Sequence, residues 1–503
     1  MNRRNFLAAA SAYTVPVMLN GFGLKAMTRQ SALVQSLMQS GAANTDRVLV
    51  IVYLNGGNDG LNTVIPVDQY STYNSLRSNI AIPQANLLTL DGTSTMAFHP
   101  AMTGMRNLYD DGRLTVINSV SYPNPDQSHF RSTDIWMTAA DANVSLTTGW
   151  AGRYLEDRFP GYPVGFPNVQ MEDPLAVQIG YLTSTTLLGS QQSMGVAIND
   201  PDAFYQLVGA GQPISPTDVP GGDAGSLITF IRLQQALAVG YAGEIKNAFD
   251  AGQTRSTYPA ASLKNSLAEQ LKIVARLIHG GLKTKIFFVS LGGFDTHSTQ
   301  ILNGNPLIGT HAELLGKVSD ALYSFQEDLR LQGTQDRVVG MTFSDFGRRA
   351  NSNAGKGTDH GVAAPQFVFG SSVKHRVIGQ NPNLSDLIPS YGGNMDIKMQ
   401  IDFRRIYADV LNDWFGAGRP KTNGLLLNNF PTISLFSDTC DTLNSGPWNA
   451  AATWTVGRVP LASERIRVNP GHVVTVSGVV SVRSAQVGGT VKYAPGARIR
   501  ITG

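Results

Sequence analysis

The sequence predicts an α/β fold, in which a mainly parallel sheet is sandwiched by helices, followed by a small all-β module at the C-terminal end. Between residues 45 and 436, short apolar runs rich in β-branched residues alternate with longer segments of helical periodicity. This alternation is typical of parallel sheets. From residue 447 to 503 the helical pattern gives way to short alternating runs separated by glycine turns.

The region 45–436 opens with a predicted strand, and helices and strands then follow in turn. Helices are favoured where apolar residues recur every three to four positions. Glycine, proline and serine cluster at residues 160–170 and 209–226, which predicts long surface loops. The predicted strands are 47–54, 114–120, 285–291 and 337–343, and the predicted helices are one from Ser128 and three at 227–249, 263–282 and 313–331.

The C-terminal module, residues 447–503, resembles the opening coils of a β-solenoid. Its alternating runs lie at 472–476, 479–482, 490–493 and 498–502. Two roles remain open for it: attachment to a component of the cell envelope, or simple stabilisation of the region before it.

Residues 1–30 resemble a twin-arginine export signal. The paired arginines at positions 3 and 4 precede a weakly apolar stretch through Gly23. The alternative is a chance basic start before a membrane helix, but this stretch is too polar and too short to span a bilayer. We therefore expect a periplasmic, secreted or surface-exposed protein, with residues 24–45 as a linker.

Composition excludes several classes of function. The 503 residues are 42% hydrophobic and 15% charged, which indicates a folded protein with a large core. The net charge is +3 and no long run of lysine and arginine occurs, so a nucleic-acid partner is not expected. The single cysteine, Cys440, excludes an internal disulfide and a multi-cysteine metal site.

Three clusters of glycine, aspartate and histidine follow predicted strands and indicate a metal site. Ligands of open α/β sheets bind beyond the carboxyl ends of the strands, and carboxylate and imidazole groups are common metal ligands. The alternative for each cluster is a turn whose aspartate hydrogen-bonds its own backbone. Two of the eight histidines stand in these clusters, which favours the metal site. The predicted ligands are Asp59, Asp295, His297 and His360.

Asp345 and Arg348 follow the predicted strand 337–343. Asp345 stands after its strand much as Asp59 does, so we predict it as a further metal ligand. The guanidinium of Arg348 is suited to bidentate contact with a phosphate or sulfate oxygen. The alternative is an ordinary solvated arginine of a surface loop.

Ser128 and His129 open a predicted helix after a proline-rich loop. Ser128 is a candidate nucleophile at a helix N-terminus, where an anionic substrate is favoured, and it is equally suited to an ordinary helix cap. His129 is a candidate ligand or acid, or a residue that only hydrogen-bonds the loop. His99 is a weaker candidate of the same kind. No Gly-x-Ser-x-Gly elbow is present, so a metal-free serine hydrolase has little support.

Six segments in order resemble a bacterial family catalogued as domain of unknown function 1501. The resemblance extends over about residues 45–435, and members of that family commonly carry twin-arginine signals. The segments that carry it are 47–66 with the motif Leu-Asn-Gly-Gly-Asn-Asp-Gly, 128–130, 147–150, 293–297, 346–348 and 357–361.

That family is similar in turn to the alkaline phosphatase and sulfatase superfamily. The similarity implies a mainly parallel sheet between helices, with one or two divalent metals at the strand ends. It also implies that Asp59 is the early aspartate, Ser128 the nucleophile, Asp295 and His297 the middle pair, and His360 the last histidine. Two departures from the superfamily pattern are the Asp-x-His spacing of the middle pair, where three intervening residues are more usual, and Phe346, which stands where a histidine is usual. The nucleophile signature of the sulfatases is also missing.

These observations predict an exported, metal-dependent hydrolase of phosphate or sulfate esters, free or carried by a polymer. Its cofactor would be one or two ions of zinc, manganese or calcium. The alternative is a non-catalytic envelope or surface binding protein on a degenerate hydrolase fold, for which Phe346 and the C-terminal module would be reasons. A third possibility is a metal site that is purely structural.

Overall fold

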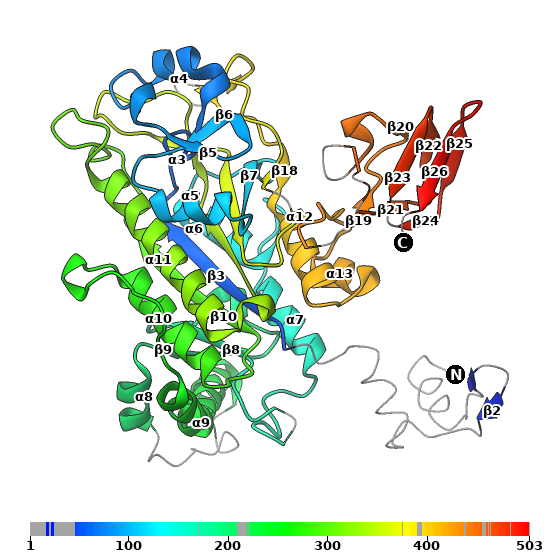
Figure 1. The fold of residues 1–503 in the computed structure, drawn as a ribbon. Coiled ribbons are helices and arrows are strands. Elements are labelled where there is room, and N and C mark those ends of the chain that lie inside the picture. The colour runs from blue at the N-terminus through cyan, green and yellow to red at the C-terminus, as the bar shows by residue number, and fades with distance from the viewer. Residues whose placement is uncertain are drawn as a thin grey trace.

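A mixed nine-stranded sheet forms the centre of the molecule (Figure 1). The structure is a computed structural model, and it describes residues 17–19, 22–24 and 46–501 except 170, 209–218, 220, 375, 390–394, 437–438, 455–458, 461, 463 and 483. The strands in spatial order are β15 (Val377–Ile378), β7 (Leu114–Ser121), β14 (Ala364–Phe369), β11 (Val338–Ser344), β3 (Val48–Asn55), β10 (Ile286–Gly292), β8 (Ala176–Ile179) and β9 (Val196–Ile198), with β18 (Ile401–Asp402) also on β7.

The sheet is parallel except for one strand. Strands β11, β3, β10, β8 and β9 pair in parallel, and β7 pairs in parallel with β15 and β18. Only β14, inserted between β11 and β7, is antiparallel to both of its neighbours. The predicted α/β class with a mainly parallel sheet is therefore confirmed.

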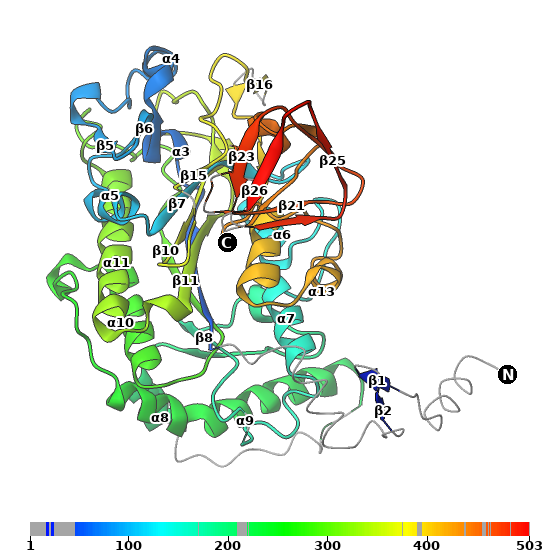
Figure 2. The ribbon, with the colours of Figure 1, turned by 45° about the vertical axis from the view of Figure 1, so that its right-hand side comes forward.

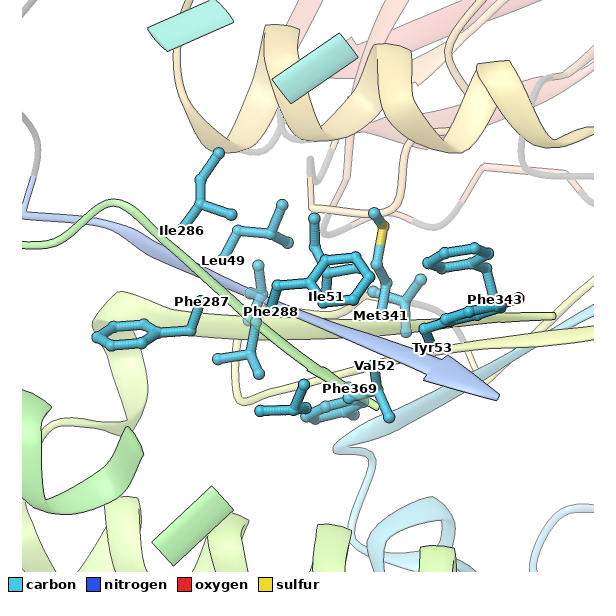
Figure 3. Packing of buried hydrophobic residues seen from close by; sticks show 14 of the residues in the cluster. Leu49, Ile51, Val52, Tyr53, Ile286, Phe287, Phe288, Met341, Phe343 and Phe369 are labelled. Carbon is cyan, nitrogen blue, oxygen red and sulfur yellow. The ribbon is translucent and has the colours of Figure 1, made fainter. Parts of the chain in front are cut away.

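The central strand β3 is buried on both faces, as expected for a parallel strand covered by helices on each side. Its residues alternate across the sheet, so that Leu49 and Ile51 lie on one side and Val52, with Phe369, on the other (Figure 3). On one side α10 packs on β10 and on α11, which packs on α5; on the other, Trp136 of α6 stacks on Phe343 and on Phe403 of α12. These helices are α5 (Thr103–Asp110), α6 (His129–Thr138), α10 (Ser266–His279), α11 (Thr310–Gln332) and α12 (Phe403–Asp409).

Three of the predicted helices are present with shifted ends. The segment predicted at 263–282 is α10, whose N-terminus is capped by the Asn265 side chain accepting from the backbone of Ala268. The segment predicted at 313–331 is α11, which begins three residues earlier and ends at Gly333 in the left-handed conformation. The segment predicted at 227–249 is the longer helix α9 (Gly222–Ala251), which packs beside α8 (Pro201–Val208).

The C-terminal strands stack in parallel, as the predicted solenoid coils require. Three strands of one coil lie directly on three strands of the next, and Figure 2 shows them as a layered unit beside α13 (Arg419–Leu425). A separate hydrophobic cluster that includes Trp448, Trp454 and Ile466 fills the coils. The two coils consist of β21 (Arg465–Val468), β22 (Val473–Val476) and β23 (Val479–Val482), followed by β24 (Ser484–Val487), β25 (Thr490–Tyr493) and β26 (Arg498–Ile501).

The predicted export signal lies almost entirely outside the described residues. Only a short antiparallel pair, β1 (Val17–Leu19) and β2 (Phe22–Leu24), belongs to it. Among the helices that the structure describes, none has the length and apolar character that crossing a bilayer requires.

Gly340 offers a test of the sheet packing. It lies in β11 opposite Phe369 of β14, and a Cβ atom at this position would stand 2.0 Å from the ring of Phe369. Because Phe369 is buried in the core, we expect Gly340→Ala to lower the free energy of unfolding by about 1–3 kcal/mol. Urea unfolding of the purified protein measures this change.

The matched control is Gly243→Ala in α9, where an added Cβ atom meets nothing within 4 Å. This variant should gain up to about 1 kcal/mol, because alanine is the better helix former. Equal stability changes in the two variants would contradict the packing described for β11 and β14.

Candidate metal centre

The predicted metal loops meet at one edge of the sheet because their strands are in register. Gly292, the last residue of β10, pairs with Asn55 of β3, and Ser344 of β11 pairs with Leu54. The three loops that follow therefore start side by side. Gly56 makes their close approach possible: its φ is +124°, and a Cβ atom there would lie 2.4 Å from the backbone nitrogen of Asp295.

Three side chains from separate elements converge at this edge. His129 is the first residue of α6, Asp295 follows β10, and His360 belongs to the two-residue strand β13 (His360–Gly361). One potential ligand atom from each lies within 4.8 Å of the other two. The carboxylate is central, since Oδ2 of Asp295 is 3.6 Å from Nε2 of His129 and Oδ1 is 3.6 Å from Nε2 of His360.

The Nδ1 atoms of His129 and His360 point away from Asp295, and each makes a hydrogen bond that places the imidazole proton on Nδ1. Nδ1 of His129 donates to Oδ2 of Asp345 over 2.6 Å, and Nδ1 of His360 donates to the carbonyl oxygen of Gln127 over 2.8 Å. In a neutral imidazole the other nitrogen then carries a lone pair. Nε2 of His129 and Nε2 of His360 are both buried and have no hydrogen-bond partner in the part of the chain that the structure describes.

Two lone pairs thus face the Asp295 carboxylate, and the hydrogen bond that Arg348 donates to this carboxylate reaches neither Nε2 atom. The arrangement is unfavourable unless a cation lies among the three groups. A carboxylate behind a ligating histidine, here Asp345, is a common second partner of metal-bound imidazoles. The donor set fits a divalent ion.

His297 lies at the solvent side of this cluster. Its Nε2 is 3.1 Å from Oδ1 of Asp295, and its Nδ1 is 3.3 Å from Oδ1 of Asp359. Its ring centre is 4.7 Å from that of His360, and its side chain is 42% exposed. It can serve as a fourth ligand or hold a proton at the mouth of the site.

The protonation states of Asp295 and His360 suit cation binding. Burial raises the pKa of Asp295, but the hydrogen bond and charge of Arg348 outweigh this effect, so the net pKa is below 3.8 and the group is an anion. Burial lowers the pKa of His360 below 6.5, and the neighbouring Arg348 lowers it further, although the hydrogen bond to Gln127 opposes the shift. His360 is therefore neutral near pH 7.

Arg348 holds the loops together and does not face the open side of the site. Strand β12 (Gly347–Arg348) pairs with β13, which places Arg348 beside His360. Its guanidinium donates to the carbonyl oxygens of Gly56, Gly57 and Thr358 and, over 2.7 Å, to Oδ1 of Asp295. In this structure the donors of Arg348 are used by the protein, one of them on Asp295, and its predicted contact with a substrate oxygen stays a prediction.

Asp59 is also placed differently from the prediction. Its carboxylate is fully buried and accepts from Nη1 of Arg77 at 2.8–2.9 Å and from Nε2 of Gln300 at 2.6 Å. Burial raises its pKa, but the charge of Arg77 and the hydrogen bonds outweigh this, so the net pKa is lower than 3.8. Asp59 is therefore the partner of a buried arginine and lies apart from the cluster of His129, Asp295 and His360.

Asp345 supports a ligand and is not brought into the cluster itself. Besides His129, its carboxylate accepts from the hydroxyl of Tyr53 over 2.7 Å and from the backbone of Gly56 over 3.3 Å. These donors surround its oxygens and leave it suited to orient His129, so its predicted role as a direct metal ligand stays a prediction.

Ser128 stands at the N-terminus of α6, next to His129, as predicted. It is exposed, and its side chain makes no capping hydrogen bond.

The ring of Phe346 packs against both histidines of the cluster: its ring centre lies 4.7 Å from that of His129 and 4.4 Å from that of His360. Phe346 is thus an apolar wall at the position where the resemblance implies a histidine.

The sequence analysis missed a buried polar network behind the centre. His311 hydrogen-bonds Asn58 over 3.0 Å, and its ring lies edge-on to His99. Gln300 links Asp59 to Thr358 of the loop that precedes His360. His311 lies in the first turn of α11, before the point where the periodic pattern predicted that helix to begin, so the only available signal was an apolar helix face interrupted by a histidine.

Replacement of Asp345 tests its role behind His129. Asp345→Asn removes the charge that fixes the His129 ring, so we expect the dissociation constant for zinc to rise about 10- to 100-fold. Competition with a chromophoric chelator measures this constant. Asp320→Asn, at an exposed position of α11, is the control and should leave it unchanged. A change of less than about twofold in Asp345→Asn would contradict the positioning role.

The two buried histidines predict a loss of stability in mild acid. Burial lowers the pKa of His99 to about 4 and that of His311 to about 3. In the unfolded chain both protonate near pH 6.5. The unfolded state therefore binds more protons below about pH 6.5, and the free energy of unfolding falls as the pH is lowered from there toward about pH 4.

Urea unfolding at about pH 7 and about pH 5 measures this loss. His311→Gln keeps a donor toward Asn58 but cannot titrate, so its loss between the two pH values should be smaller than that of the wild-type protein. An equal loss in both proteins would show that His311 does not contribute.

Comparisons with known proteins give a family and several distant structures. A comparison with curated proteins found no match. Three solved structures match with TM-scores below 0.5, so they carry no argument about function. They are a protein in the alkaline phosphatase superfamily from Vibrio parahaemolyticus (TM-score 0.31, 12% identity, 67% of this chain and 64% of that one), the zinc complex of the C-terminal periplasmic domain of EcEptC from Escherichia coli (0.32, 11%, 66% and 75%) and the PsFucS1 sulfatase from Pseudoalteromonas sp. (0.34, 10%, 80% and 77%).

The family match covers α9 to α13 and all of the metal loops except those after β3 and β7. The segments 47–66 and 128–130, which also carry the resemblance, lie outside it. The family model that matches residues 225–425 of the chain is described as "Protein of unknown function (DUF1501)".

Proposed function

We propose that the protein is a metal-dependent hydrolase of phosphate or sulfate esters. The observation that carries the proposal is the convergence of the two unpartnered Nε2 atoms of His129 and His360 on the Asp295 carboxylate. These residues, together with His297, would hold the ion. When bound, a divalent ion supplies polarisation of an ester oxygen and lowers the pKa of a hydroxyl or water.

The ligand set favours zinc, with manganese second. Two or three imidazoles and one carboxylate are typical of zinc sites, whereas calcium requires six to eight oxygen ligands. We propose a single ion per chain. The reason is that the two other carboxylates of the predicted set are engaged, Asp59 with Arg77 and Asp345 with His129, while Phe346 offers no ligand atom.

The residues of this chain supply binding and proton transfer around the ion. The backbone N–H groups at the start of α6 favour an anionic group beside Ser128, whose exposed hydroxyl is free of a capping bond and is the candidate nucleophile. His297, between the carboxylates of Asp295 and Asp359, can take or return a proton at the solvent side. The paired arginines 3 and 4 support export of the folded protein, so we propose that it acts outside the cytoplasm.

The second candidate is a binding protein without turnover. The guanidinium groups of Arg348 and Arg349 are both used by the protein, the latter on the carbonyl of His360 and the carboxylate of Asp359. A transferring phosphoryl or sulfuryl group is usually stabilised by such cations. Their engagement favours a centre that binds an ester or a metal without hydrolysing it.

Metal content and turnover of the full-length protein test both candidates. Native mass spectrometry should find one divalent ion per chain, lost in His129→Ala and His360→Ala and kept in the control His279→Ala. Asp59→Asn should also keep one ion, although its melting temperature falls because Arg77 loses its partner. With aryl phosphate or aryl sulfate, kcat/KM should fall at least about 100-fold in the two ligand variants.

Three results separate the outcomes. Absence of metal after zinc titration would overturn the metal centre itself. One bound ion with no turnover of either ester would favour the binding protein. Two bound ions, reduced to one in Asp59→Asn, would restore Asp59 as a ligand and overturn the single-ion site.

A further inference from the structure

A polar cleft of about 770 Å³ lies apart from the metal cluster. It is bounded by the hairpin of β5 (Leu88–Leu90) and β6 (Thr93–Phe98), by β7, by Lys374 and by the segment 376–383. No residue of the cluster lines it. Most of its lining side chains carry hydrogen-bonding groups, among them Asp68, Asp91, Thr93, Asn118, Lys374 and Gln380.

Asn118 of β7 is the first sign that the cleft is built for a ligand. Asn118 is one of the residues that line the cleft, it is 2% exposed, and its Nδ2 has no hydrogen-bond partner among the described residues. A buried amide donor that lacks a partner is unfavourable, and such groups in folded proteins usually meet water or a ligand. The cleft is the space from which that partner would come.

The backbone beside Asn118 is strained. Ser119 has a φ of +50°, which is rare for a residue with a side chain. Opposite it, the pairing of β7 with β14 shifts register between Ala364 and Gln366, and Gln400 hydrogen-bonds the carbonyl and hydroxyl of Ser119. Such irregularities turn a side chain out of the regular alternation and are common at binding sites. Here the residue next to the strained position is Asn118.

The charges in the cleft balance and leave both donors and acceptors for a ligand. Arg376 pairs with Asp91 over 3.2 Å, and Asp68 accepts from Asn381 over 2.7 Å. Lys374 is exposed and makes no ion pair among the described residues. Two carboxylates against two cations give no net charge, so a small anion would meet as much repulsion as attraction.

The character of the lining also excludes an apolar or aromatic ligand. The only aliphatic side chains are those of Met96 and Val377, and the ring of Tyr109 is buried beneath the guanidinium of Arg376 at 5.7 Å. The hydroxyl groups of a ligand both donate and accept hydrogen bonds, so they can pair with the amide, threonine and carboxylate side chains that line this cleft. A molecule that presents many hydroxyl groups at this size is a saccharide.

We propose that this cleft binds a saccharide chain, with Asn118 as a buried donor and Lys374, Asp68 and Thr93 as further contacts. The inference rests on the cleft alone and does not require the metal centre or hydrolysis. It makes the chain a protein with two separate sites, one for a metal and one for a glycan.

The full-length protein can be tested with a panel of defined hexasaccharides: cellohexaose, maltohexaose, chitohexaose and the hexamer of galacturonic acid. Saturation-transfer NMR detects binding, and calorimetry gives the dissociation constant. We expect at least one member to bind, at least tenfold more weakly to Asn118→Leu and Lys374→Ala, and equally well to the control Lys492→Ala in β25. His360→Ala should bind like the wild-type protein.

Folding is checked by the melting temperature. Asn118→Leu removes an unpaired buried amide, so its melting temperature should be unchanged or higher, and loss of binding in this variant then reports on the cleft. If the variant fails to fold, exposed Lys374→Ala decides. The proposal is overturned if no hexasaccharide binds at millimolar concentration, if neither cleft variant weakens binding, or if His360→Ala abolishes it. It is also overturned if inorganic phosphate binds in the cleft and Lys374→Ala removes that binding.

Discussion

The buried guanidinium of Arg348 is the interaction on which the geometry of the metal centre depends. An arginine taken out of water requires partners for its charge and its donors. Here the partners come from the loops after β3 and β10 and from the loop before β13, so one side chain fixes three segments that are distant in the sequence. Because Arg348 also pairs with Asp295, the carboxylate at the middle of the cluster is held in place before any ligand arrives. The same engagement removes Arg348 from direct contact with a substrate.

A second buried arginine explains why a metal centre of this kind would hold one ion. Arg77 and Asp59 are both inaccessible to solvent, and the pair sits in a network of amide and hydroxyl groups behind the cluster. An internal cation thus neutralises a carboxylate that would otherwise need a metal. The ring of Phe346 packs on His129 and His360, and it offers no ligand atom for a second ion. The unpartnered Nε2 atoms of both rings lie on the side that faces Asp295.

The sequence predicted the strands and the loops better than the partners within the loops. Strands β3, β10 and β11 are continuous apolar runs, and parallel pairing brings their ends together, so Asp295 and His360 were predictable as neighbours. The pattern could not show that Asp59 binds Arg77, because Arg77 follows an ordinary helical segment and reaches Asp59 only through the fold. The position of a motif after its strand indicates which side chains reach the carboxyl edge of the sheet. Whether a carboxylate there binds a metal ion or an arginine is decided by tertiary contacts. The antiparallel insertion of β14 was missed for the same reason, as strand direction leaves no mark on a short apolar run.

Proton and metal compete for the same lone pairs, and the surroundings decide between them. A proton on Nε2 of His360 would gain from the nearby Asp295 carboxylate, yet burial and the charge of Arg348 keep the pKa of His360 below 6.5. Asp295 remains ionised, and in the described part of the chain the Nε2 atoms of His129 and His360 have no hydrogen-bond partner. A single proton can satisfy only one of the two histidines, whereas a divalent ion can accept both lone pairs and the carboxylate together. The arrangement of these three groups therefore suits a divalent cation better than a proton, and Arg348, which is paired with His360 and hydrogen-bonded to Asp295, helps to hold it.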